Sequence, residues 1–180
     1  MTIICYGDSN TWGYDPRSFL GDRYPAEYRW PELLAQKTNW NVVNMGINGL
    51  EIPEKPFIPP DNPDILLIML GTNNLLQGST ANETAMRMDR FLSTIPFPAD
   101  RIILIAPPAM RPGEWVSDEK LLKESMHLPA AYEKIAAARS IRFINASSWH
   151  IPLCFDGVHF TESGNVIFAN NLLTILVNST

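Results

Sequence analysis

The sequence lacks any apolar run long enough to cross a lipid bilayer. The longest such run covers residues 65–70 of the 180-residue chain, whereas a membrane-spanning helix needs about 20 apolar residues. The first residues also lack the basic region and long apolar segment of a secretory signal, because residues 3–6 already have the character of a core strand. We therefore expect a soluble, cytoplasmic protein with no membrane partner.

An excess of positive charge is also missing. The chain carries 14 basic and 19 acidic residues, a net charge of −5, and no basic cluster, which argues against nucleic acid as a partner. An apolar content of 46% with 18% charged residues is typical of a globular protein. A chain of 180 residues is long enough for one well-buried domain and short for two, so we expect a single domain over residues 1–180.

Cysteine is scarce, and several cofactor motifs are absent. In a cytosolic chain, Cys5 and Cys154 are expected to be small buried side chains and not a disulfide. The sequence has no Cys and His cluster suited to zinc and no Gly-rich nucleotide motif. The Gly-x-Ser-x-Gly motif of α/β-hydrolases is missing too. We expect neither a metal nor an organic cofactor.

Five short apolar runs alternate with segments of helical character. The expected strands are residues 3–6, 41–45, 64–70, 101–106 and 142–145. Helices are expected at residues 30–38, 81–95 and, capped by Thr161, 161–177. Residues 117–138 form either two helices or one helix kinked near Pro129. This alternation predicts an α/β fold, a parallel sheet with helices on both faces.

Residues 53–63 contain five prolines, which forbid both a helix and a central strand. We expect a stiff loop there. The loop either forms a wall beside a pocket or is a simple surface connection, and the sequence leaves both alternatives open.

Polar motifs follow four of the apolar segments. These motifs are Gly7-Asp8-Ser9-Asn10, residues 44–49, Gly71-Thr72-Asn73-Asn74, and Asp156-Gly157-Val158-His159. The carboxyl ends of parallel strands meet at one edge of a sheet, where open α/β folds bind their ligands. We therefore expect the four motifs to lie at that edge.

A serine nucleophile needs a base, and the base needs a group that orients it. Of the three histidines, His127 and His150 have no motif around them, whereas His159 lies three residues after Asp156. This spacing allows a tight turn to bring the carboxylate to one imidazole nitrogen while the other faces Ser9. An isolated Asp-x-x-His is nevertheless more often an ordinary turn.

Acyl transfer also needs donors for a developing oxyanion. The backbone N–H groups of Ser9 and Gly49 and the side-chain amide of Asn73 are candidates. Taken singly, turn geometry and helix capping explain these residues better.

The four motifs together resemble the SGNH (GDSL-type) hydrolase superfamily in order and spacing, over nearly the whole chain. The resemblance implies a flavodoxin-like three-layer α/β/α sandwich with a five-stranded parallel sheet. It implies Ser9 as nucleophile, His159 as general base and acid, and Asp156 as its orienting partner. It also implies an oxyanion hole of Ser9, Gly49 and Asn73. Gly49 is preferred to Gly46 because the family's glycine is the later one of this stretch.

Within the superfamily, the chain is most similar to the bacterial arylesterase branch, at residues 7–14, 29–30, 68–73 and 156–162. Members of that branch hydrolyse small aryl and short acyl esters, and some transfer acyl groups to peroxide. Two features depart from that branch. Asn74 stands where the family usually has Asp, and the loop at residues 50–63 is shorter. The shorter loop leaves substrate choice and a homo-oligomeric assembly open.

Four aromatic residues are candidates for lining an acyl or aryl pocket: Trp12, Tyr14, Trp115 and Phe160. Trp12 is the best placed of them because it lies three residues beyond Ser9, although large aromatic side chains most often belong to the core.

We expect a serine esterase that hydrolyses short-chain acyl or aryl esters through an acyl-enzyme intermediate, with a small-molecule ester as its substrate. Two alternatives stand beside it. One is a carbohydrate O-acetyl esterase, and the other is a non-catalytic small-molecule binding module on the same fold.

Overall fold

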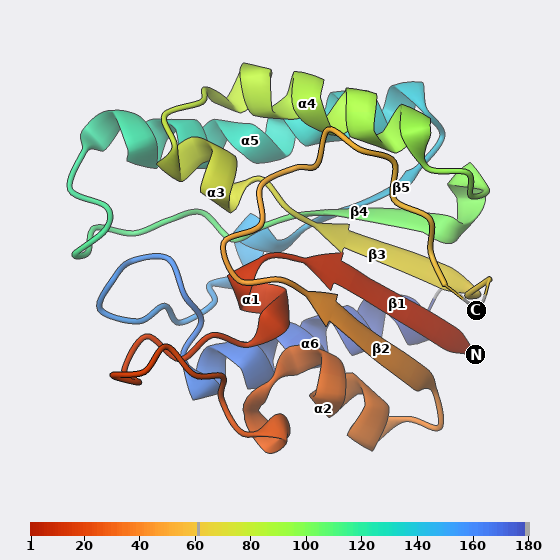
Figure 1. Ribbon diagram of the computed structural model, residues 1–180, viewed down its shortest axis with the longest axis horizontal. Helices are drawn as coiled ribbons and strands as arrows, with labels where there is room; N and C mark the ends of the chain where they lie inside the picture. The colour runs from red at the N-terminus through yellow and green to blue at the C-terminus, as the bar shows by residue number, and fades with distance from the viewer. Residues whose placement is uncertain (61, 179–180) are drawn as a thin grey trace.

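A five-stranded parallel sheet lies at the centre of the molecule, with the strand order β2-β1-β3-β4-β5 (Figure 1). The computed structural model describes residues 1–60 and 62–178. The strands are β1 (Thr2–Gly7), β2 (Asn41–Gly46), β3 (Ile65–Met69), β4 (Ile102–Ala106) and β5 (Arg142–Asn145). All four neighbouring pairs are parallel. The five expected strands are confirmed.

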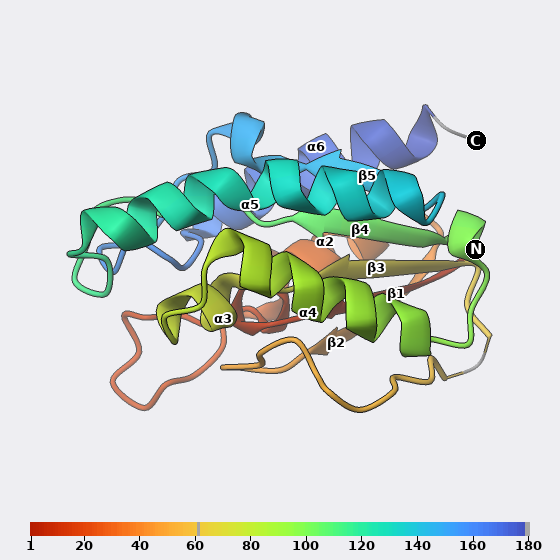
Figure 2. The ribbon, with the colours of Figure 1, turned by 90° about the horizontal axis from the view of Figure 1, so that it is seen from above.

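Helices cover both faces of the sheet (Figures 1 and 2). On one face lie α3 (Thr72–Leu76), α4 (Ala81–Thr94) and α5 (Glu119–Ala138), and on the other lie α2 (Trp30–Lys37) and α6 (Glu162–Val177). Successive strand residues point to opposite faces, so Ile4 packs in the core under α4 and α5 while Ile3 and Cys5 pack in the core against α2 and α6. The three-layer α/β/α sandwich is confirmed.

The segment around Pro129 forms one continuous helix, α5, which settles the alternative that the sequence left open. Leu128 and Tyr132, on either side of the proline, are buried, and the Tyr132 hydroxyl donates a hydrogen bond to the Leu70 carbonyl at 3.0 Å. This packing against the sheet offsets the hydrogen bond that proline cannot make within a helix.

Helix starts are well defined by capping side chains. The Thr161 side chain accepts a hydrogen bond from the Gly164 backbone at 2.9 Å, as expected for the cap of α6. Thr80 and Glu83 form a reciprocal capping box at the start of α4. Among the described residues, no helix has both the length and the apolar character that a bilayer span requires.

Several short elements were not predicted. They are the helix α1 (Ser9–Trp12), the helix α3, and the 3₁₀ turns Ala26–Tyr28, Ala99–Arg101 and Ala146–Trp149. Each has five or fewer residues, too few for a hydrophobic period to show in the sequence.

The proline-rich loop lies over the sheet beside β1. Its described residues, 53–60 and 62–63, contain neither helix nor strand, as expected, and residue 61 lies outside the described part of the chain. Phe57 stacks on Tyr6 with 4.0 Å between ring centroids, and Ile52 is buried. This part of the loop therefore completes the hydrophobic core on the α4 side.

Gly46 brings the end of β2 against α1, since a Cβ added there would lie 2.1 Å from the Trp12 backbone nitrogen. We predict that Gly46→Ala lowers the free energy of unfolding by about 2–3 kcal/mol, because two backbones must separate. Gly78→Ala is the control. Gly78 has a φ of +91° but open space around it, so its loss is expected to be about 1 kcal/mol. Urea unfolding of both variants measures the difference, and equal losses would contradict the prediction.

Candidate active site

Three polar side chains meet at the carboxyl edge of the sheet, the left edge in Figure 1. Ser9 opens α1 directly after β1, and Asp156 and His159 lie on the loop that precedes α6. The Ser9 Oγ is 2.9 Å from His159 Nε2, and His159 Nδ1 is 2.7 Å from Asp156 Oδ2. All three residues are buried, with at most 3% of their surface exposed. The structure thus brings together the three residues that the sequence nominated.

Asp156 closes a tight turn on itself. Its Oδ1 accepts hydrogen bonds from the backbone amides of Val158 at 2.8 Å and His159 at 3.0 Å, which leaves Oδ2 for the imidazole. Burial raises the pKa of Asp156, but these hydrogen bonds and the one from the His159 ring together outweigh it and leave the pKa below its ordinary value. An ionised Asp156 accepts a hydrogen bond from the Nδ1–H group of His159, so Nε2 is left to accept a hydrogen bond from the Ser9 hydroxyl.

Asp8 shapes the strand-to-helix turn that presents Ser9. Its Oδ1 accepts from the Asn10 backbone amide at 3.0 Å and caps α1. Its buried Oδ2 accepts no hydrogen bond of normal geometry within the described part of the chain, although the Thr72 hydroxyl is near enough to lower the pKa. Burial dominates and raises the pKa of Asp8 to about 6, against the opposing Asn10 hydrogen bond.

Asn10 joins the serine helix to the histidine loop. Its side-chain Nδ2 donates to the Val158 carbonyl at 3.2 Å, and its Oδ1 accepts from the Phe160 backbone amide at 2.9 Å. The two hydrogen bonds hold the residues on either side of His159 in place, and Asn10 itself is the neighbour of Ser9. One buried side chain thus sets the position of both reacting residues. The sequence analysis missed this role, because the partners lie about 150 residues away.

The two other oxyanion-hole candidates lie at the same edge. The Ile47 amide donates to the Gly7 carbonyl at 3.0 Å, which ties the turn after β2 to the end of β1. Within that turn Gly49 has a φ of +75° and open space where a Cβ would stand. The Asn73 Nδ2 donates to the Leu50 carbonyl at 3.0 Å, so its amide already faces this turn.

The departure at Asn74 has a structural reason. Asn74 is fully buried, its Oδ1 accepts from the Ile52 amide at 3.0 Å, and its Nδ2 donates to the Glu51 carboxylate at 2.8 Å. An Asp there would keep the first hydrogen bond but would face Glu51 with a second negative charge. The amide at position 74 therefore matches the acid at position 51 and fixes the start of the proline-rich loop.

Two aromatic rings pack on His159. The Tyr14 and Trp115 ring centroids lie 4.6 and 5.0 Å from that of the imidazole. Trp12 instead packs beside Tyr14 at 6.4 Å and under the Arg23 guanidinium at 5.1 Å. Phe160 is buried against α6 in the core. Tyr14 and Trp115 are thus the aromatic candidates beside the histidine, and a role for Trp12 in the pocket stays a prediction.

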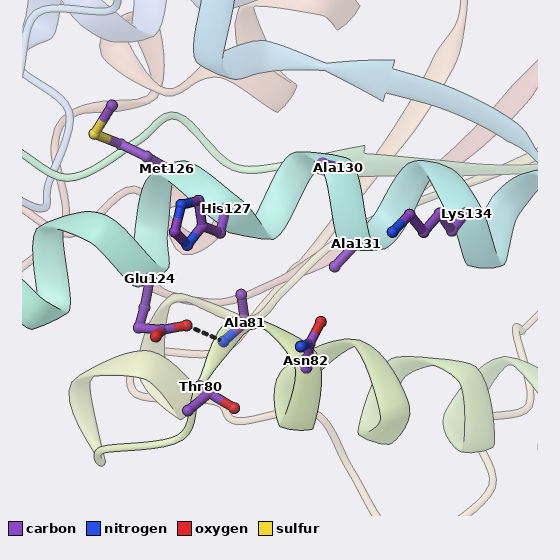
Figure 3. Close-up of a pocket in the computed structure, with 9 residues that line it drawn as sticks. All are labelled: Thr80, Ala81, Asn82, Glu124, Met126, His127, Ala130, Ala131 and Lys134. Atoms are coloured by element: carbon purple, nitrogen blue, oxygen red, sulfur yellow. Dashed lines mark hydrogen bonds between the residues drawn. The ribbon is translucent and has the colours of Figure 1, made fainter.

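The remaining histidines lie apart from this site. His150 is exposed in a loop, and His127 is exposed on α5. His127 lines a hollow of about 410 Å³ between α4 and α5, where Glu124 accepts a hydrogen bond from the Ala81 amide (Figure 3). The described residues that line this hollow include no serine or cysteine, so His127 has no partner there like the one that His159 has in Ser9.

Both cysteines are free, and Cys5 is buried as expected, whereas Cys154 is only half-buried. Burial raises the pKa of the Cys154 thiol, so it is not an activated nucleophile. Within residues 1–60 and 62–178, no group of three or more His, Cys, Asp or Glu side chains is arranged to hold a metal ion.

Comparison with protein families matches residues 5–167 to the GDSL-like lipase/acylhydrolase family. The chain belongs to this family. Family membership makes it a hydrolytic esterase of the GDSL type and confirms the resemblance seen in the motifs. No curated protein matches the chain significantly.

Solved structures share the fold over the full length of this GDSL-type chain. A protein from Agrobacterium tumefaciens proposed to be an arylesterase is 24% identical, with a TM-score of 0.82 and 98% of each chain covered. The aryl esterase of M. smegmatis is 23% identical, with a TM-score of 0.80 and 98% of each chain covered. A carbohydrate acetylesterase from Sinorhizobium meliloti is 21% identical, with a TM-score of 0.80 and 99% of each chain covered.

The Asn10 bridge generates a test. We predict that Asn10→Leu lowers kcat for an ester substrate about 10–100-fold with little change in KM, because a shift of about 1 Å between serine and histidine is that costly. Asn165→Leu is the matched control. Asn165 is also a buried asparagine, and it joins the Trp30 amide to the Thr161 carbonyl through hydrogen bonds that involve neither Ser9 nor His159. It is expected to lose stability and keep kcat, and equal kcat in both variants would contradict the role of Asn10.

The buried carboxyl of Asp8 generates a second test. Since its pKa rises from 3.8 to about 6 on folding, the charged form destabilises the fold above that range, while below pH 3.8 no penalty remains. Asp8→Asn keeps an acceptor for the Asn10 amide without the charge. We predict that it raises the free energy of unfolding at pH 8 by about 2–3 kcal/mol and changes it little at pH 4. Denaturant titrations at both pH values measure this, and a gain independent of pH would contradict it.

Proposed function

We propose that the protein is a serine esterase that hydrolyses short-chain acyl or aryl esters through an acyl-enzyme intermediate. The observation that supports this most directly is the unbroken hydrogen-bond chain from Ser9 Oγ through the His159 ring to Asp156 Oδ2, at 2.9 and 2.7 Å. A hydroxyl, a base and an orienting carboxylate in this arrangement are what acyl transfer needs.

In the proposed reaction, Ser9 Oγ attacks the ester carbonyl carbon while His159 Nε2 takes its proton. Asp156 holds the Nδ1–H and stabilises the positive ring. The ring then gives the proton to the oxygen of the leaving alcohol, and the acyl group stays on Ser9. In the second half, His159 takes a proton from water, the hydroxide attacks the acyl group, and Ser9 regains its proton as the acid leaves.

The oxyanion is proposed to receive hydrogen bonds from the backbone amides of Ser9 and Gly49 and from the Asn73 side chain. The Asn73 amide supports this role because its Nδ2 carries two N–H donors, and its hydrogen bond to the Leu50 carbonyl uses one of them. Its present acceptor is the Leu50 carbonyl, one residue beyond Gly49, and a developing oxyanion is a stronger acceptor than a neutral carbonyl. These groups supply proton transfer and charge stabilisation, so the proposed reaction uses no metal or organic cofactor.

A carbohydrate O-acetyl esterase is the second candidate. Trp115 is 49% exposed beside His159, and a sugar ring can stack on its indole there. The fold of a carbohydrate acetylesterase from Sinorhizobium meliloti is similar, at 21% identity. A non-catalytic binding module is disfavoured, because binding alone does not require a serine, a histidine and an aspartate in one hydrogen-bond chain.

We predict that the wild-type protein hydrolyses p-nitrophenyl acetate, with rates falling for the butyrate and the octanoate. Ser9→Ala is expected to lower kcat by at least about 10³-fold, because the covalent step is lost. Exposed Ser148 provides the control substitution, Ser148→Ala, which is expected to keep full activity.

A fluorophosphonate probe checks the same proposal without turnover. One adduct on wild type and none on Ser9→Ala are expected. A folded wild type without an adduct would favour the binding module, and equal hydrolysis by both proteins would remove Ser9 from the mechanism.

A further inference from the structure

Trp115 combines large exposure with a fixed position. About half of its surface, 49%, is exposed. Such exposure is unusual, because tryptophan side chains are on average largely buried. Yet its backbone amide donates to the Asp156 carbonyl at 3.1 Å, and the next residue, Val116, is buried. The indole therefore stands at a defined place on the surface.

The loop that carries Trp115 is seated directly on the loop that carries Asp156. The Arg111 amide donates to the Gly157 carbonyl at 3.0 Å, and the Glu114 amide donates to the Phe155 carbonyl at 3.1 Å. A Cβ added to Gly113 would lie 2.5 Å from the Asp156 carbonyl carbon, so the backbones touch. Contacts this close tie the position of the indole to Asp156 and, through it, to His159.

The indole meets the imidazole at its edge. The ring centroids of Trp115 and His159 are 5.0 Å apart with an interplanar angle of 84°. Tyr14 packs on the same imidazole at 4.6 Å and 58°. Beside these contacts, Trp115 keeps about half of its surface, 49%, exposed to another molecule.

The proposed mechanism indicates which part of an ester substrate would contact the exposed indole. His159 must reach the oxygen of the leaving group, whereas Gly49 and Asn73, which follow β2 and β3, face the acyl carbonyl. Trp115 comes from the loop after β4 and borders His159. This contact with His159 assigns the exposed indole to the leaving-group side of the ester.

We propose that Trp115 is a stacking surface for a ring in the leaving group, so that the enzyme prefers small acyl esters of aryl, benzyl or sugar-ring alcohols over esters of chain alcohols. This inference rests on the proposed esterase function. Stacking on an aromatic side chain contributes on the order of 0.5–1.5 kcal/mol, which converts to a preference of about 2–13-fold in kcat/KM.

The test compares benzyl acetate with 2-methoxyethyl acetate, two acetates whose leaving alcohols are similarly acidic. In Trp115→Ala, the kcat/KM for benzyl acetate divided by that for 2-methoxyethyl acetate is expected to fall about 2–13-fold. Trp115→Phe is expected to keep most of the wild-type ratio. Tyr28→Ala, which removes an exposed aromatic ring on another element, is the control and is expected to leave the ratio unchanged. An unchanged ratio in a folded Trp115→Ala would overturn the proposal.

A second comparison tests the side of the substrate. The ratio between benzyl acetate and benzyl butyrate is expected to stay the same in Trp115→Ala, because the acyl group lies elsewhere. A change confined to this ratio would place Trp115 on the acyl side and overturn the proposal. Phenyl acetate and methyl 6-O-acetylglucoside then distinguish the two ring classes, since the larger fold-loss in Trp115→Ala identifies the ring that stacks.

Binding without turnover separates this proposal from the proposed function. Benzyl alcohol, the leaving group itself, is expected to quench tryptophan fluorescence in wild type and to do so less in Trp115→Phe. If wild type shows this quenching but hydrolyses no ester, the esterase proposal fails while the stacking surface stands. If wild type hydrolyses esters but the quenching is the same in both proteins, the stacking surface is wrong and the esterase stands.

Discussion

The position of β1 between β2 and β3, covered on both faces, is the constraint on which the rest of the structure depends. Its residues pack alternately into the two cores, with Ile4 on one side and Ile3 and Cys5 on the other. A parallel strand buried in this way must direct its carboxyl end to the same edge as its neighbours. Ser9 lies two residues after the end of β1. Its hydroxyl is therefore at the carboxyl edge of the sheet, where the other four strands also end.

Two buried carboxyl groups close to Ser9 show how nearby hydrogen-bond donors shift the pKa of an acid. Asp156 receives two backbone hydrogen bonds and one from the imidazole, and its pKa stays below the ordinary value despite burial. Asp8 receives fewer, and burial raises its pKa to about 6. The difference follows from hydrogen-bond donors that replace water around one carboxylate but not fully around the other. Asp8 is thus a cost in stability that the fold accepts at the turn that presents Ser9.

The site is assembled from loops that hold one another. Asn10 forms hydrogen bonds with the residues on both sides of His159. Asn74 fixes the start of the proline-rich loop, and the loop that carries Trp115 packs on the turn of Asp156. Each contact joins segments that are distant in the chain but leave the sheet at the same edge. The proposed division of the substrate follows from this assembly, with the acyl carbonyl towards Gly49 and Asn73 and the leaving group towards His159.

Local pattern alone predicted the strands, the long helices and the capping Thr161, because periodicity and caps act between near neighbours in the chain. Ser9, Asp156 and His159 were assigned by the resemblance of four motifs taken together, since each motif by itself is explained as well by an ordinary turn. Local pattern did not reveal α1 or α3, and it left the continuity of α5 through Pro129 open. Only the tertiary structure decided the bridge of Asn10, the pairing of Asn74 with Glu51, the raised pKa of Asp8 and the place of Trp115. These features depend on burial and on hydrogen bonds across many residues, up to 150 for Asn10, which leave no signal in the local sequence.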